Sequence, residues 1–418
     1  MLDTSLADWL DRLGYDTVGD ALLREPGEIG RRPYAAELHD LLDPQGDFGM
    51  AAIFLVESTP TICFAAGAAF ADSAHIDAVR QRLWNQNLAS ALVVLDEEEA
   101  RAFSIPKWRR QQHPDVLNRD DARPDGIWSA AEVQSSDLQR RLEDWFDPSR
   151  RVDRHLLRQL SLSVTALTSG DRPLIASQLE AQMLLAQVLF VSYLEHRGIV
   201  GGAYREEHGL RTLSDLVSSG DGAGVDGLID RLKTDFNGDF LEPDEIRWSD
   251  LDGGVLAVVG KLLARVDLST GQQDFWNYDF SQIPVELLSG IYETFLQDER
   301  KVDGAYYTPR VLAELAVEQA FEGLEDLSDI RIYDGACGSG ILLTTAFRKT
   351  IAYEQAKLGR FLDIAERIAL LKRAIFGGDI NPIACRVTAF SLYLCLLERL
   401  SPPDLINLQR DHDCRLPR

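Results

Sequence analysis

The segment that most constrains this 418-residue chain is a run of glycines that follows an apolar strand pattern in its last quarter. Asp329–Tyr333 has the composition of a strand, Asp334-Gly-Ala-Cys-Gly-Ser-Gly340 follows it, and a helical pattern covers 341–357. Periodicity and turn residues therefore predict a strand, a glycine turn and a helix. The next elements alternate in the same way: a helix over 362–374, a strand over 375–378 and a helix over 382–400. This order is typical of the first half of a doubly wound α/β sheet.

Two acidic residues close the two predicted strands: Asp334 opens the glycine turn and Asp379 follows the second strand. Gly338 and Gly340 allow the backbone to turn sharply and approach a ligand closely. The spacing is that of neither a dinucleotide nor a P-loop motif, and an acid at the strand end suits an amino-bearing ligand better than a phosphate. An acid after the second strand can accept hydrogen bonds from a ribose diol. The pair favours a pocket for S-adenosylmethionine, an adenosine with a cationic amino-acid tail, over a turn that only packs strand against helix.

A third segment, Gly304-Ala-Tyr-Tyr-Thr-Pro309, lies upstream of a helical pattern over Arg310–Phe321. Thr308 is predicted to cap this helix, with Pro309 at the first helical position. Alone, the segment is an ordinary helix start. Its place before the two strands that end in acids makes the combination specific.

In this order the segments GAYYTP, DGACGSGILL and GGDINPIACRVT resemble the N6-adenine DNA methyltransferases of restriction–modification and phage-defence systems, in their gamma-class arrangement. Three upstream stretches look like the helical region before the methylase core of large single-chain methylases of the BREX and type IIL kinds: 184–198, 236–240 and 280–296. The resemblance is strong in the motifs and weaker between them. It implies an enzyme that transfers a methyl group from S-adenosylmethionine to adenine N6 in double-stranded DNA.

The resemblance also implies a role for each motif residue. Tyr307, Thr308 and Pro309 would line the methionine side of the cofactor, Asp379 would hold the ribose hydroxyls, and Ile380 would lie against the adenine. The turn beneath the cofactor would consist of Asp334, Cys337, Gly338 and Gly340, with Ala336 and Ser339 in the same loop. No metal ligands are expected.

The sequence departs from the family at the catalytic motif, which is Asn, Asp or Ser, then Pro-Pro, then an aromatic residue. In that motif the polar side chain holds the adenine amine and the ring stacks on the flipped base. Ser401-Pro-Pro-Asp404 has an acid where the ring is needed and directly follows the helix after Asp379. Asn381-Pro-Ile-Ala384 opens a helix and has no aromatic residue. We therefore assign no catalytic residue.

Three explanations stay open, because the sequence stops at Arg418, where the third strand is expected. The chain is truncated, which we favour, or its gene is split, or it is a degenerate subunit. The alternative function is thus a catalytically inactive subunit that senses S-adenosylmethionine or acts as a scaffold in a defence complex; methylation of RNA or protein is a weaker hypothesis. The expected partners are double-stranded DNA and either companion defence-system subunits or the missing C-terminal methylase and target-recognition portion, with no membrane.

The N-terminal third predicts a small α/β module, since a hairpin of Ala51–Glu57 and Thr61–Ala66 precedes a helix over 75–88 and a strand at Ala91–Leu95. Acids follow these strands, but no lysine completes a nuclease-type Asp…Glu-x-Lys site. A structural or partner-binding module, nuclease-like in fold at most and without a site, is the expectation.

Overall, the fold class is expected to be α/β plus α-helical, in three parts. Residues 1–130 form the N-terminal α/β module and a linker, 131–300 a helical domain, and 301–418 the truncated S-adenosylmethionine-binding part of a Rossmann-like methyltransferase domain. Within these parts, the polar stretch 106–130 is predicted to be an irregular linker and Gly220–Gly227 a flexible loop.

Composition sets outer limits on function. A hydrophobic fraction of 45% and a charged fraction of 26% are typical of a folded chain and exclude a disordered one. The net charge of −24 argues against a chain that coats nucleic acid over its whole surface, but not against binding in a local groove. The many arginines in 101–158 are expected beside acids on solvated helix faces. Scattered cysteines, no signal peptide and only short apolar runs predict a cytoplasmic protein.

Overall fold

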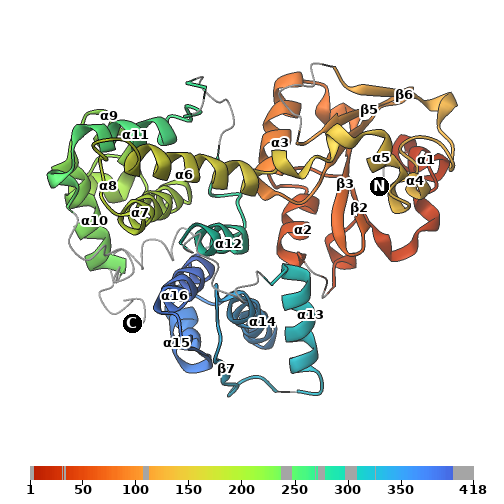
Figure 1. The fold of residues 1–418 in the computed structure, drawn as a ribbon. Coiled ribbons are helices and arrows are strands. Elements are labelled where there is room, and N and C mark those ends of the chain that lie inside the picture. The colour runs from red at the N-terminus through yellow and green to blue at the C-terminus, as the bar shows by residue number, and fades with distance from the viewer. Residues whose placement is uncertain are drawn as a thin grey trace. The chain divides into compact units, whose positions relative to one another are not determined.

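The computed structural model describes residues 4–30, 32, 34–106, 113–236, 247–268, 270–271, 278–296, 308–324 and 326–398. The chain divides into two compact units (Figure 1). Unit 1 comprises Met1–His155 and Trp276–Ile283, and unit 2 comprises Leu156–Phe275 and Pro284–Arg418. These units are defined by the contacts within the chain. The domain boundaries expected at residues 130 and 300 stay a prediction.

Unit 1 contains a six-stranded sheet in which the strands lie side by side in chain order. Its strands are β1 Leu22–Leu23, β2 Ala52–Val56, β3 Thr59–Ala66, β4 Ala91–Leu95, β5 Glu99–Ser104 and β6 Asp115–Asn118. Only β3 and β4 pair in parallel; the other neighbours are antiparallel. The predicted hairpin and the strand at 91–95 are confirmed. The prediction of an irregular linker over 106–130 is wrong, because β6 extends the sheet by pairing with β5.

The parallel pair in this sheet requires a crossover connection, and a helix supplies it. This helix, α3 Ser73–Gln86, confirms the predicted helix over 75–88; Asp72 caps its start by accepting a hydrogen bond from the Ala74 amide, and Asn87 ends it in the left-handed region at φ 61°. The other helices of the unit are α1 Thr4–Arg12, α2 Ala35–Leu42, α4 Ala130–Gln134 and α5 Asp137–Arg141.

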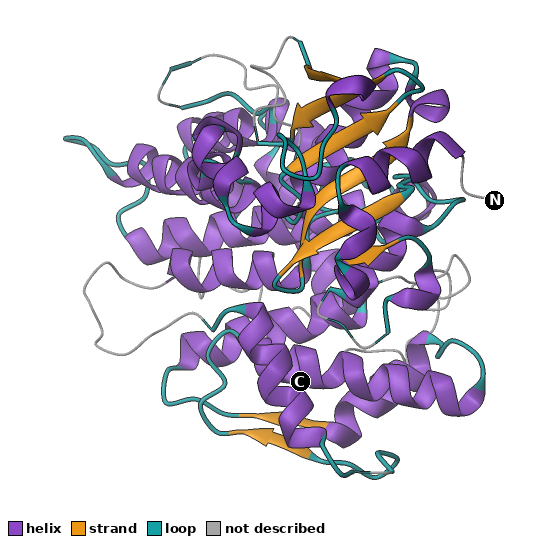
Figure 2. Cartoon of the chain, turned by 90° about the vertical axis from the view of Figure 1, so that its right-hand side faces the viewer, coloured by secondary structure: helices purple, strands orange, loops and turns teal. Residues whose placement is uncertain are grey.

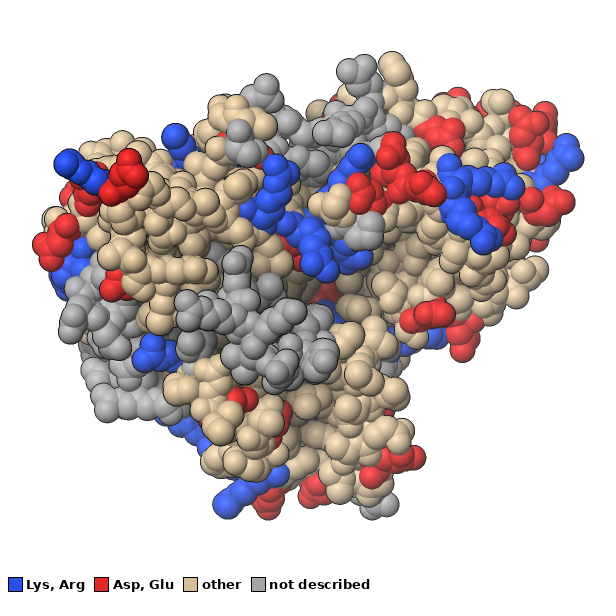
Figure 3. Space-filling model, viewed as in Figure 1, with Lys and Arg blue, Asp and Glu red and all other residues tan. Residues whose placement is uncertain are grey.

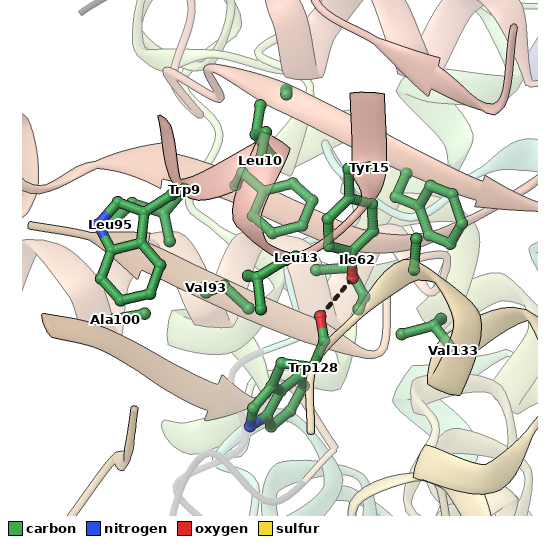
Figure 4. Close-up of a cluster of buried hydrophobic side chains, with 14 of the residues drawn as sticks. Trp9, Leu10, Leu13, Tyr15, Ile62, Val93, Leu95, Ala100, Trp128 and Val133 are labelled. Carbon is green, nitrogen blue, oxygen red and sulfur yellow. Dashed lines mark hydrogen bonds between the residues drawn. The ribbon is translucent and has the colours of Figure 1, made fainter. Parts of the chain in front are cut away.

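The core of unit 1 joins residues from both ends of this part of the chain (Figure 4). Trp9 and Tyr15 from the N-terminal segment are fully buried against strand residues such as Ile62 and Val93. The Tyr15 hydroxyl donates a hydrogen bond to the Trp128 carbonyl oxygen at 2.8 Å, and burial raises the pKa of this tyrosine. Burying a large apolar side chain stabilises a fold by about 1.5–3 kcal/mol. The N-terminal segment and the stretch around Trp128 are therefore integral to the module.

A short segment returns to unit 1 after more than a hundred residues in unit 2. The Tyr278 hydroxyl lies 2.5 Å from His155 Nδ1, and its ring stacks on Trp84 with centroids 6.0 Å apart. The Asp279 amide donates to Asn85 Oδ1 at 2.9 Å. Since Trp84 and Asn85 are buried residues of α3, the returning segment completes the packing of unit 1.

Unit 2 begins with a helical region, as predicted. Its helices are α6 Val152–Thr168, whose first four residues belong to unit 1, α7 Gln178–His196, α8 Gly202–His208, α9 Leu213–Ser218, α10 Gly222–Phe236, α11 Gly253–Leu263 and α12 Val285–Leu296. Most of α7 is buried, and Gly198 follows it with φ 72°, as expected for a helix end. The prediction of a flexible loop at Gly220–Gly227 is wrong, because α10 begins at Gly222. A Cβ atom there would collide with the Trp248 carbonyl, so this glycine permits close packing.

The remaining part of unit 2 follows the predicted order of elements: α13 Arg310–Phe321, β7 Ile332–Asp334, α14 Ile341–Leu358, α15 Ile364–Ala374, β8 Ile375–Gly377 and α16 Pro382–Leu396. The strands β7 and β8 pair in parallel and form a sheet separate from the six-stranded one (Figure 2). The expected mixture of α/β and helical structure is confirmed.

Positive and negative side chains lie side by side in several places on the face shown in Figure 3. Arginines of 101–158 pair with nearby acids: Arg101 with Asp96, Arg119 with Asp8, Arg140 with Asp137, Arg141 with Glu132, and Arg150 with Asp147. Arg140 and Arg141 are exposed residues of α5, so for these two the prediction of acid-paired arginines on solvated helix faces is confirmed. Within the described part of the chain, no helix is both long and apolar enough to span a bilayer.

Candidate functional site

The two acids predicted to share a site lie at the same edge of the small sheet. Asp334 is the last residue of β7 and is the register partner of Gly377 in β8. The Gly378 amide donates to the Asp334 carbonyl oxygen at 2.8 Å, which extends the parallel pairing by one bond. Asp379 follows at once. The carboxyl ends of the two strands therefore bring together residues that are distant in sequence.

The glycine turn between β7 and α14 is held by hydrogen bonds along its length. Asp334 Oδ1 accepts from the Ala336 amide at 3.0 Å, and the Cys337 amide donates to the Gly378 carbonyl oxygen at 3.0 Å. The Gly340 amide donates to the Cys337 carbonyl oxygen at 2.7 Å. Gly338 and Gly340 have φ values of 52° and 83°, which residues with a side chain adopt only at a cost. The turn therefore has positive φ angles at both glycines, which the sequence predicts to allow a sharp turn.

Asp379 ties the second strand to this turn. Its Oδ2 accepts a hydrogen bond from the Gly338 amide at 3.1 Å, and its Oδ1 accepts one from the Asn381 amide at 2.8 Å. Each carboxylate oxygen has a second lone pair, so the group retains acceptor capacity for a ligand. The next residue, Ile380, is fully exposed at 101%. A carboxylate beside a solvent-facing apolar side chain suits a ribose joined to an aromatic base.

Sequence reasoning missed three side chains that contact the turn. Thr388 and Ser391 of α16 donate hydrogen bonds to the carbonyl oxygens of Gly338 and Ser339 at 2.9 and 2.7 Å. Tyr333 of β7 lies over the turn, since a Cβ atom at Gly335 would be 3.3 Å from its ring. Thr388 ends the segment GGDINPIACRVT, but the sequence assigns none of the three a contact with the turn, because these contacts depend on how α16 and β7 pack.

The upstream motif is only partly described. Tyr307 lies outside the described residues, whereas Thr308 is half-buried and Pro309 exposed. The prediction that Thr308 caps the helix is wrong: Pro309 is the N-cap residue of α13, and no side-chain cap bond forms. Thr308 and Pro309 directly precede α13, which packs against α14, the helix that follows the glycine turn.

Cys337 is buried within the turn. Burial raises the pKa of its thiol, and a hydrogen bond with Thr388 opposes this shift only in part. Burial also raises the pKa of both Cys63 and Cys395 to about 12. Because the thiolate is the reactive form, these three cysteines should react slowly.

Iodoacetamide at pH 8 should therefore alkylate Cys385, which is half-buried, well before Cys63, Cys337 or Cys395. We suggest a Cys414→Ser background, because Cys414 lies outside the described residues. Mass spectrometry of peptides over a time course measures the order, and labelling in urea provides the fully exposed control. Modification of Cys337 as fast as Cys385 would contradict the buried placement of the turn.

The donor set of this site fits S-adenosylmethionine on structural grounds. Two carboxylates, Asp334 and Asp379, lie at adjacent strand ends, and Ala336 of the glycine turn is exposed. The carboxylates match an amino group and a ribose diol, and Ile380 offers an apolar surface for a base. Among the described residues, no cluster of His, Cys, Asp and Glu suitable for a metal ion occurs.

Comparison with protein families finds a match over residues 284–398, to the family described as N-6 DNA Methylase. The matched segment contains β7, the glycine turn, β8 and Asp379. It starts with α12 and ends just after α16, so it coincides with the last part of unit 2.

Two curated relatives are similar over about a third of this chain. The Type I restriction enzyme MjaIX methylase subunit of Methanocaldococcus jannaschii is 30% identical over 148 residues, which are 33% of this chain and 23% of the relative. The Adenine-specific methyltransferase BrxX of Escherichia coli O9:H4 is 30% identical over 146 residues, 33% of this chain and 12% of the relative. The matches therefore span less than a quarter of either relative's length.

A solved structure, a cryo-EM structure of a DrdV–DNA complex, aligns with 84% of this chain and 33% of its own at 12% identity. Its TM-score is 0.29, which does not establish a common fold.

Proposed function

We propose that this chain binds S-adenosylmethionine at the glycine turn and forms the cofactor-binding portion of a DNA methyltransferase that modifies adenine N6. The match of residues 284–398 to the N-6 DNA Methylase family supports this proposal. The observation that carries the proposal is the Asp379–Gly338 hydrogen bond, which ties the second acid to the turn of the first. The similarity to a restriction methylase subunit and to BrxX supports a role in restriction–modification or phage defence.

Each residue of the site has a distinct task in this proposal. Asp379 accepts hydrogen bonds from the ribose hydroxyls, and Ile380 packs against the adenine. Asp334 and the turn Ala336–Gly340 lie beneath the methionine portion, and the segment Tyr307–Pro309 lines its other side. When bound, the cofactor supplies an activated methyl group on its sulfonium. The chain's contribution is to bind and orient it, which is a large part of the catalysis of group transfer.

The small sheet supports a further part of this proposal, a larger Rossmann-like domain. Tyr333 and Phe376 are register partners in β7 and β8, so they face the same side, where they are 72% and 43% exposed. Parallel sheets are normally covered on both faces, and two strands alone are marginal. We expect additional strands and helices to cover this face, from a C-terminal methylase and target-recognition portion or from a companion subunit. Such a portion would also supply the catalytic motif and bind double-stranded DNA.

Transfer of labelled methyl from S-adenosylmethionine to unmodified DNA tests the function directly. The assay compares this chain alone with the chain plus the polypeptide encoded downstream of it. We expect S-adenosylmethionine binding by the chain alone, and methylation of adenine only when the second polypeptide is present.

The other outcomes separate the alternatives. Transfer by the chain alone would show that a catalytic segment was overlooked. Binding without transfer in either case would favour the sensing or scaffolding subunit. Absence of S-adenosylmethionine binding would overturn the proposal.

A further inference from the structure

The third helix after the glycine turn, α16, contacts the turn through two hydroxyl groups, those of Thr388 and Ser391, to which the sequence pattern assigns no role. Thr388 Oγ1 donates to the Gly338 carbonyl oxygen at 2.9 Å, and Ser391 Oγ donates to the Ser339 carbonyl oxygen at 2.7 Å. The two residues are three positions apart in a helix, so they lie on one face. Both are buried, with exposed fractions of 5% and 0%.

These hydroxyls donate hydrogen bonds to the carbonyl groups of two consecutive residues, in the part of the turn that contains positive φ angles. Gly338 has a positive φ, and a Cβ atom at Gly340 would be only 3.0 Å from Thr388 Cγ2. The helix therefore holds the turn both by hydrogen bonds and by close contact. The Ser391 hydroxyl also lies 2.8 Å from the Val387 carbonyl oxygen of its own helix, so its proton is shared between two acceptors.

The direction of a carbonyl fixes the direction of the amide beside it. In a planar trans peptide, the carbonyl of one residue and the N–H of the next point in opposite directions. Because the Gly338 carbonyl is directed toward α16, the Ser339 N–H is directed away from it. The two hydroxyls thus set the orientation of backbone donors in the turn, as well as its position.

We propose that Thr388 and Ser391 are positioning residues for the cofactor: they hold the glycine turn in its binding conformation before S-adenosylmethionine arrives. This inference rests on the proposed function of the turn. A turn ordered in advance loses less conformational freedom on binding, so the hydroxyls increase affinity without touching the ligand. They act through Gly338 and Ser339 and leave the chemistry of the transfer to other groups.

The first test measures S-adenosylmethionine affinity by calorimetry for Thr388→Val, Ser391→Ala and the double variant of the full chain. Each single substitution should weaken binding about fivefold to tenfold, as expected for one neutral hydrogen bond, and the double variant should weaken it more. Thr388→Ser keeps the hydroxyl and should retain most of the wild-type affinity.

Two matched controls are available in the same unit. Thr350 and Ser192 are also buried, and each donates to the carbonyl oxygen four residues earlier in its own helix. Thr350→Val and Ser192→Ala should lower the melting temperature to a similar extent and leave affinity unchanged. Unchanged affinity in folded Thr388→Val and Ser391→Ala, or an equal loss in the controls, would overturn the proposal.

A second readout does not depend on the cofactor. Hydrogen exchange without ligand should be faster at residues 335–340 in Thr388→Val and Ser391→Ala, and unchanged there in the two controls. Failure of the wild-type chain to bind S-adenosylmethionine would contradict the proposed function. Unchanged exchange at the turn would contradict the positioning role by itself, so the two failures are distinguishable.

Discussion

S-adenosylmethionine binding should be lost in two variants of the proposed site, Asp379→Ala after β8 and Ala336→Trp in the glycine turn. Asp379→Ala removes a carboxylate that we assign to the ribose hydroxyls and that also accepts from the Gly338 amide. Hydrogen bonds to a charged group are worth about 1.5–3 kcal/mol each, so we expect affinity to fall by about 100-fold or more. The indole of Ala336→Trp projects from an exposed position of the turn into the space assigned to the ligand.

Calorimetric titration with S-adenosylmethionine measures this loss, and circular dichroism verifies that the variants fold. Asp329→Ala removes an exposed acid just before β7, and Ala352→Trp adds an indole at an exposed position of α14. Both controls should bind as the wild-type chain does. Wild-type affinity in both Asp379→Ala and Ala336→Trp would contradict the placement of the cofactor at this turn, even for a chain that binds S-adenosylmethionine elsewhere.

The largest effect on stability is expected at Glu286, a nearly buried carboxylate of α12. The Arg348 guanidinium of α14 contacts its Oε1, and Arg310 Nη1 of α13 lies 3.6 Å from its Oε2. The two guanidinium groups balance the charge of the Glu286 carboxylate by ion pairing. Removing one partner of a buried pair leaves charge uncompensated, which typically costs about 3–5 kcal/mol.

For Glu286→Ala we expect the free energy of unfolding to fall by about 3 kcal/mol. This value is at the lower end of the range because Arg310 still pairs with Glu314 and Arg348 with Glu398. Urea denaturation followed by fluorescence provides the midpoint. The matched control is Glu318→Ala, which breaks a more exposed pair with Lys349 and should cost less than about 1 kcal/mol. Equal shifts of the urea midpoint in the two variants would contradict the view that the Glu286 carboxylate stabilises these helices by balancing buried charge.

The local parts of the fold can be predicted from the sequence, because their signals lie within a few neighbouring residues. The strand, turn and helix around Asp334, and the hairpin at 51–66, have alternation, turn residues and helical periodicity that need no tertiary information. Parallel pairing of β7 and β8 also follows from the predicted doubly wound sheet, in which neighbouring strands are parallel and are connected by helical crossovers. The sequence pattern alone therefore places the acids at their ends together.

The errors arise where packing decides the conformation. β6 is a short edge strand with a half-buried, half-exposed pattern, and it forms because β5 offers free hydrogen-bonding groups. The glycines at the start of α10 are typical of a flexible loop, but at Gly222 the absence of a side chain allows the Trp248 carbonyl to approach. Thr388 and Ser391 lie about 50 residues from the turn, and helical periodicity alone identifies only the face on which they lie.

The return of residues 276–283 to unit 1 has a consequence for the order of events during synthesis of the protein. Until Tyr278 and Asp279 have left the ribosome, the nascent unit 1 lacks the partners of His155 and Asn85. Domains of a growing chain generally fold from the N-terminus as they emerge. Unit 1, however, can complete its packing only after most of the helical region has been translated. An N-terminal fragment cut after His155 would leave the same surface of α3 uncovered. A recombination event in the gene between the codons for His155 and Trp276 would therefore separate the returning segment from the rest of unit 1.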